Sequence, residues 1–273
     1  MQRRKMIPAI AAATAAIAAG NAAAGEAKTA PAALSSPFGD PSGLYPENPA
    51  IRRILSRLAE AASGKAGTLS TREKKIAVLA AWAGTGCAEA LEEKAGDIVG
   101  SDFTADELRE LVYQSTAYLG AGRTARLFAA MNRGFRKAGI SAADASKALE
   151  GDRRTEGNRL QIEGYGPQME RRWEKVPADI APVHEFLAEN CFGDYYARPS
   201  TLNWQEREGY TFLMLAAFAA APAQAKAHAV GSIRCGISRE KLLASLWVML
   251  PWIGYPSTLN AVSAVNDATK PAK

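Results

Sequence analysis

The sequence predicts an all-α protein made of two tandem helical units, and three observations support this prediction. Alanine dominates the 273 residues, whereas valine and isoleucine are sparse, a composition that favours helix. Apolar residues recur at helical spacing, and no segment alternates as a strand would. A shift of 134 residues superimposes Lys94–Asn132 on His228–Asn266 without a gap, which indicates a duplicated unit. The aligned pairs include Thr104 with Ser238 and Gly120 with Gly254.

The N-terminus has the layout of an export signal. Residues 1–24 combine a basic start, a short apolar run and small residues suited to cleavage after Ala24. Arg3 and Arg4 hint at the twin-arginine route, so we expect a periplasmic or secreted protein; the alternative is an alanine-rich helix that stays attached. The apolar run is too short for a membrane span. Residues 25–48 are rich in Ala, Pro, Ser and Gly, which predicts a flexible linker.

The first predicted unit covers residues 49–138. An amphipathic helix begins at Pro49, and a second helix, capped at Thr71, is apolar nearly all round and should be buried. Thr104 and Glu107 form a capping box that opens a further helix. Glycines at 120 and 122 end that helix, and one more runs to about Lys137.

A polar connector, residues 139–176, leads to the second predicted unit, residues 177–273. The connector shows no apolar period. In the helix expected over Asp179–Asn190, Val183, Phe186 and Leu187 should face inward. Further helices are expected over Trp204–Ala220, Ala223–Cys235, Ser238–Leu250 and Pro256–Asp267.

Charge and cysteine content exclude several functional classes. The formal net charge is +5, and Arg3, Arg4 and Lys5 of the expected signal contribute three of these charges. No Lys/Arg cluster is interleaved with aromatic residues, so no nucleic-acid partner is expected. Cysteines at 87, 191 and 235 lack zinc spacing, and no glycine-rich phosphate loop occurs. The sequence therefore predicts neither a metal nor an organic cofactor.

Several motifs in the second half carry a family resemblance. They are W-x-E-R-E, then H-A-x-x-S-x-x-x-G-I-S-x-E, then G-Y-P-S-T-L-N-A, preceded by FGDYYARP and, further upstream, RRTEGNRLQIEGYG. Together they resemble the carboxymuconolactone decarboxylase family, which includes the AhpD-type alkylhydroperoxidases. The resemblance covers roughly residues 50–266 and is better in the second half. It implies a helical bundle of tandem AhpD-like units, a small-molecule substrate and a homo-oligomer.

Glu208 and His228 are the leading candidates for catalysis. His228 follows a break at Pro222 and lies among alanines, where it is either a hydrogen-bonded core histidine or a proton-transfer residue. Glu208 lies near the start of a helix that becomes wholly apolar, so it is either a partly buried acid or a first-turn residue complementing the helix dipole. The resemblance implies that the two act together, with His228 moving a proton and Glu208 orienting it.

Cys87 supports an alternative chemistry. The peroxidase branch of the family carries C-x-x-C-x-x-x-H, but the first half of this chain has Cys87, Ala90 and Lys94 at those places, and the second half has Ala221, Gln224 and His228. Without a resolving cysteine, Cys87 would need an outside thiol, with Lys94 favouring the thiolate. Otherwise it is a small buried helix residue.

The resemblance also indicates residues that contact the substrate. Trp252 and Tyr255 flank Gly254 in the family's turn, and Lys94 could attract a carboxylate. The expected reaction is acid–base decarboxylation or ring chemistry on a small carboxylated lactone, with the second unit catalytic and the first degenerate. A thiol-dependent peroxidase and a non-catalytic module are the alternatives.

Overall fold

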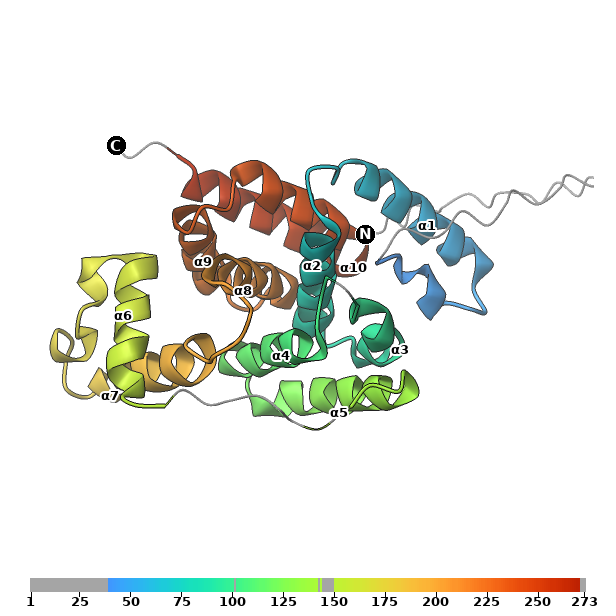
Figure 1. Cartoon of the computed structure of the whole chain (residues 1–273). Helices are drawn as coiled ribbons and strands as arrows, with labels where there is room; N and C mark the ends of the chain where they lie inside the picture. The colour runs from blue at the N-terminus through green and yellow to red at the C-terminus, as the bar shows by residue number, and fades with distance from the viewer. Residues whose placement is uncertain (1–38, 101, 142, 144–149, 271–273) are drawn as a thin grey trace, which may run out of the picture. The chain divides into compact units, whose positions relative to one another are not determined.

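The computed structural model describes residues 39–100, 102–141, 143 and 150–270 (Figure 1). The expected signal, residues 1–24, and the linker residues 25–38 lie outside the described part. Within it the chain is helical and forms no strand, so the all-α prediction is confirmed. The α-helices are α1 (Pro49–Gly64), α2 (Thr71–Thr85), α3 (Ala88–Ile98), α4 (Ala105–Leu119), α5 (Ala121–Lys137), α6 (Arg153–Tyr165), α7 (Ala181–Phe186), α8 (Trp204–Phe218), α9 (Pro222–Arg234) and α10 (Arg239–Ala268). Short 3₁₀ helices are η1 (Pro41–Leu44), η2 (Pro167–Met169) and η3 (Arg172–Glu174), and η4 (Leu187–Tyr196) is a π-helix.

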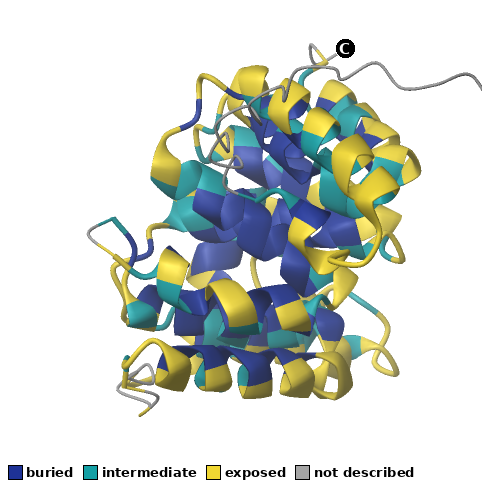
Figure 2. Cartoon of the chain, turned by 90° about the vertical axis from the view of Figure 1, so that its right-hand side faces the viewer, coloured by how far each residue is buried: buried dark blue, intermediate teal, exposed yellow. Residues whose placement is uncertain are grey.

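Helices α2 and α8 pack against each other at the centre of the core (Figure 1). Both are apolar nearly all round, and most of their residues are buried, as Figure 2 shows for the middle of the molecule. Gly84 permits the close approach, because a Cβ there would lie 2.4 Å from the carbonyl oxygen of Met214. Burial of apolar surface on all sides of this pair is the main stabilising contribution of the core.

Local structure recurs at the 134-residue spacing of the sequence repeat. Thr104 caps α4 and Ser238 caps α10, each through a side-chain oxygen that accepts an N–H of the first turn. Gly120 (φ 77°, ψ 157°) and Gly254 (φ 73°, ψ 172°) have nearly the same backbone conformation, which a side chain would disfavour. Gly254 breaks α10 as Gly120 separates α4 from α5.

The chain between the two halves departs from the predicted connector. Residues Arg153–Tyr165 form α6, which packs against η4. Close packing depends on Gly157, where a Cβ would lie 1.9 Å from the carbonyl oxygen of Ala188. Helix α6 carries few apolar residues on any one face, so its sequence gives no amphipathic period. Its burial combines this backbone contact with a small apolar cluster in which Leu160 and Tyr165 meet side chains of η4.

Other local predictions need correction. Val183 and Phe186 are exposed (60% and 65%) because α7 ends at Phe186 and the chain continues as a π-helix, which changes the face that packs inward. Ser70, one residue before the expected Thr71, caps α2. In the predicted linker, Asp40 caps η1 and accepts from Ser56, so this part of the linker is structured.

Among the described helices, only α10 is long and apolar enough to cross a membrane by length and composition. A core helix can have the same length and composition. Leu242, Leu246 and Met249 of α10 are buried in the core, and the helix is broken at Gly254.

Candidate functional site

Glu208 and His228 meet in the structure. The Nδ1 atom of His228 lies 3.0 and 2.9 Å from the two carboxylate oxygens of Glu208. Glu208 is fully buried on α8, and His228 on α9 keeps 8% of its side chain exposed. Because Nδ1 faces a carboxylate, we assign its proton to Nδ1, which leaves Nε2 with a free lone pair. Nε2 has no hydrogen-bond partner among the described residues, whereas Nδ1 contacts both Glu208 and Tyr165.

A glycine lets these two helices approach. Gly231 lies on α9, and a Cβ at this position would be 2.6 Å from Glu208 Oε1 and 3.3 Å from Tyr165 Cε1. A contact of 2.6 Å is far inside van der Waals distance, so a larger residue would push the carboxylate away from His228. The sequence thus provides the geometry of the pair through a small residue three positions after the histidine.

Three tyrosines surround the pair. The hydroxyl of Tyr165 donates to Glu208 Oε1 and lies 2.8 Å from His228 Nδ1, and Tyr196 donates to Glu208 Oε2 at 3.1 Å. Tyr118 meets the imidazole edge-on, with ring centroids 5.2 Å apart. Its hydroxyl donates to that of Tyr196 at 3.2 Å, which links all three rings to one polar cluster.

The tyrosines are held in their neutral form. Burial raises the pKa of Tyr165 well above 10, and the neighbouring Glu208 carboxylate raises it further. Burial and the same carboxylate also raise the pKa of Tyr196. Neutral hydroxyls can donate to Glu208, and together with His228 they satisfy a carboxylate that has lost its water. The cluster is therefore a stable way to bury one acid beside one imidazole.

A polar network beneath the cluster ties the two halves of the chain together. Gln114 of α4 donates to Thr211 (2.7 Å) and to the carbonyl of Arg207 (2.8 Å) on α8. Arg207, 2% exposed, pairs with the equally buried Glu110 at 3.3 Å. Since Thr211 also hydrogen-bonds Tyr196, α4 positions part of the site that α8 and α9 carry. The site therefore requires residues from both halves.

Ser232 adds an unsatisfied group on the His228 side of α9. It follows His228 by four residues, which places it on the same helix face. The residue is fully buried, and its hydroxyl has no partner among the described residues. A buried hydroxyl without a partner costs free energy.

The sequence anticipated Glu208 and His228 but not the tyrosines. Tyr165 and Tyr196 lie in the motifs RRTEGNRLQIEGYG and FGDYYARP, which carried the family resemblance without being assigned a role. Tyr118 aligns with Trp252 under the 134-residue shift, and that alignment is the signal that could have marked it.

The remaining predicted site residues lie elsewhere. Cys87 is the N-cap of α3, where burial raises the pKa of its thiol and the Glu89 carboxylate adds to the effect. Lys94 pairs with Glu93 and Asp97 at 3.2 and 3.4 Å, so the expected stabilisation of a thiolate by Lys94 is not found.

The three predicted substrate contacts also lie apart from the Glu208–His228 pair. Lys94 and Trp252 line a separate cavity of about 310 Å³, and Tyr255 is 62% exposed on α10. Among the described residues, no group of three or more His, Cys, Asp or Glu side chains is placed to hold a metal ion.

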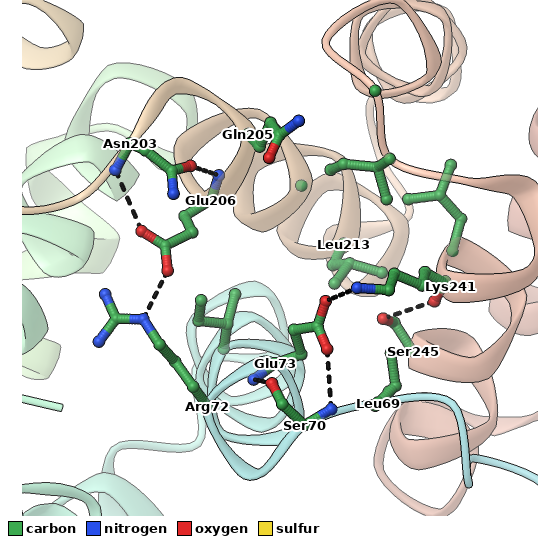
Figure 3. Close-up of a pocket in the computed structure, with 15 residues that line it drawn as sticks. Leu69, Ser70, Arg72, Glu73, Asn203, Gln205, Glu206, Leu213, Lys241 and Ser245 are labelled. Atoms are coloured by element: carbon green, nitrogen blue, oxygen red, sulfur yellow. Dashed lines mark hydrogen bonds and ion pairs between the residues drawn. The ribbon is translucent and has the colours of Figure 1, made fainter. Parts of the chain in front are cut away.

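A second polar cavity lies where α2, α8 and α10 begin, with a volume of about 350 Å³ (Figure 3). Its charged groups pair with one another: Arg72 contacts Glu206 at 2.5 Å, and Lys241 contacts Glu73 at 2.6 Å. Glu73 also belongs to the capping box of α2, as Glu206 belongs to that of α8. These pairs hold the helix starts together and leave no charge in the cavity that calls for a ligand.

The sequence matches no protein-family model, and a search of curated proteins finds no match either. The functional interpretation therefore depends on the geometry of the site and on the motifs quoted from the sequence.

Proposed function

We propose that this protein is an acid–base enzyme in which His228 moves a proton on a small organic substrate and Glu208 orients and stabilises the imidazole. The observation that supports this is the contact between His228 Nδ1 and the buried Glu208 carboxylate at 2.9–3.0 Å, which leaves Nε2 free. A histidine whose second nitrogen is bound by a carboxylate is a common arrangement for general acid–base catalysis.

The proposed substrate class is a small carboxylated lactone, as the family resemblance implies. Loss of CO₂ breaks the carbon–carboxylate bond and leaves the electron pair on an enolate-like carbon. His228 in its protonated form would give a proton to that carbon from Nε2, and a proton from solvent would restore it. Glu208 would stabilise the imidazolium, and the neutral hydroxyls of Tyr165 and Tyr196 would keep the carboxylate in place.

The proposal includes a division of labour between two tandem units. Under the repeat, Lys94 takes the place of His228. Lys75 is the fifth residue of α2, and Glu208 is the fifth residue of α8. Lys75 forms an ion pair with Asp102 at 2.7 Å, whereas Glu208 contacts a histidine. The first unit thus lacks the acid–base pair, but it supplies Tyr118 and Gln114 to the site of the second. This supports a degenerate first unit that is retained for packing and for completing the site.

The thiol-peroxidase alternative is less well supported. Burial raises the pKa of all three thiols: that of Cys87 is raised, that of Cys235 is raised to about 11, and that of Cys191 to about 12. This disfavours a peroxidase, because a thiol must ionise to attack a peroxide. Export to the periplasm or beyond remains part of the proposal and rests on the first 24 residues of the sequence.

The test is a screen of carboxylated γ-lactones in which turnover is measured as CO₂ release and as loss of ultraviolet absorbance. His228→Gln should lower turnover by about 10²–10⁴-fold, the usual contribution of a general acid or base. His184→Gln is the matched control, because His184 is the other of the two histidines. Undiminished turnover in His228→Gln would overturn the proposal.

A parallel assay addresses the alternative. Peroxide consumption with a dithiol reductant is compared between the wild type and Cys87→Ser. Consumption that disappears in Cys87→Ser would replace the acid–base assignment with a one-cysteine peroxidase.

A further inference from the structure

A cavity of about 310 Å³ separate from the Glu208–His228 pair has the features of a ligand site. It lies between η1, α1, α3 and the end of the first half of α10, with Trp82 of α2 as one wall. Helix α3 packs on α2 and α5, whereas α9 packs on α8 and α10, so the two helices lie on opposite sides of the α2–α8 pair (Figure 1). This cavity is therefore a different site from that of His228.

The indole N–H of Trp82 has no partner among the described residues, although the residue is only 2% exposed. Indole nitrogen can only donate, and a buried donor without an acceptor costs free energy. The second tryptophan of the cavity, Trp252, donates its N–H to the carbonyl of Gly39. Of the two tryptophans that line the cavity, Trp82 therefore has the unused indole donor, and the two rings meet edge to face at 5.6 Å.

The charges around the cavity do not favour an anion. Lys94 is held by Glu93 and Asp97, and Asp40 accepts from Ser42 and Ser56. With Arg52, the cavity is lined by two positive and three negative side chains. A ligand here would gain from aromatic contact and from accepting one hydrogen bond, and little from net charge.

The repeat relates this cavity to the candidate active site. A shift of 134 residues aligns Lys94 with His228 and Trp252 with Tyr118, the ring that contacts His228 edge-on. The cavity therefore has the aromatic wall of the active site without its acid–base pair. Such a site can bind a small molecule without transforming it.

We propose that the cavity lined by Trp82 and Trp252 binds a small neutral aromatic molecule whose carbonyl oxygen or ring nitrogen accepts a hydrogen bond from Trp82 Nε1. Its volume is at the small end for ligand sites, which limits the ligand to one or two rings. The inference does not depend on the proposed enzymatic activity, because its readout is binding.

The test uses 4-fluorobenzamide, a neutral aromatic carbonyl compound, titrated into the full chain and followed by ¹⁹F line broadening. Saturable binding is expected, and Trp82→Phe, which keeps the ring but removes the N–H, should raise Kd about five-fold or more. Trp173→Phe is the matched control, since Trp173 lies on η3 outside the cavity. Fluorobenzene, which lacks the acceptor, should bind more weakly and equally to the wild type and Trp82→Phe.

Two further measurements keep the proposal testable if Trp82→Phe does not fold. Ala90→Leu fills the cavity from α3 and should abolish saturable binding. In the wild type, the probe should shift one or two of the five tryptophan indole N–H signals in a ¹H–¹⁵N spectrum. Any one of three outcomes would overturn the proposal. They are the absence of saturable binding to the wild type, an unchanged Kd in both Trp82→Phe and Ala90→Leu, and the absence of a shifted indole signal.

Discussion

Replacing Gly231 by alanine tests the close approach of α9 to Glu208. Alanine in a helix is about 1 kcal/mol more favourable than glycine, so an open site would be stabilised. At Gly231 the added Cβ would meet Glu208 Oε1 at 2.6 Å, in a core where overpacking costs about 1–3 kcal/mol. Displacing the carboxylate would also weaken its hydrogen bonds to His228 and Tyr165, at about 1 kcal/mol each. We expect a net loss of about 2–4 kcal/mol in the free energy of unfolding.

Gly122→Ala is the matched control for this substitution. Gly122 lies in the first turn of α5, is exposed, and has no atom within 4 Å of an added Cβ. We expect it to be neutral or stabilised by up to about 1 kcal/mol. The free energy of unfolding of both variants is measured by urea denaturation, monitored by circular dichroism. The comparison requires that the dependence of this free energy on urea concentration is the same for each variant. If Gly231→Ala were stabilised as much as Gly122→Ala, α9 would not lie against Glu208, and the arrangement of the site would be wrong.

Three other predictions concern ionisation. Burial raises the pKa of Glu107, but hydrogen bonds from Arg72 and Thr201 outweigh this effect and lower the pKa to about 2. Glu107→Gln should therefore lower the free energy of unfolding by about 1–3 kcal/mol above about pH 5. This difference from the wild type should vanish as the pH falls from about 4.5 toward 2. A difference that persists unchanged at pH 2 would contradict this sign. Iodoacetamide at pH 8 should alkylate Cys87, Cys191 and Cys235 of the folded protein at least about ten-fold more slowly than in urea, since burial raises all three pKa values; faster reaction of Cys87 than of free cysteine would revive the peroxidase alternative. In ¹⁵N spectra, His228 should show the Nδ1–H tautomer and lose this preference in Glu208→Gln, whereas an Nε2–H tautomer in the wild type would refute the assignment.

The sequence determined the helical class and the principal reactive residues. Alanine-rich periodic runs specify helices locally, and capping residues such as Thr104 and Ser238 act within one turn, so both can be read from neighbouring positions. Glu208 and His228 were recognisable because their motifs resemble those of a known family. Their meeting across 20 residues depends on Gly231, whose importance the sequence alone did not reveal.

Tertiary structure decided which other side chains complete the site. Tyr165 lies on α6, a helix without an amphipathic period, which packs against η4 through a backbone contact at Gly157 and a small apolar cluster around Leu160. Tyr118 reaches His228 from the other half of the chain, a contact of 110 residues' separation that no local pattern encodes. Lys94 and Trp252, chosen from the sequence as substrate contacts, lie together in the other cavity. Local propensities act over a few residues, whereas the composition of a buried polar cluster depends on which distant helices pack closely enough to exclude water.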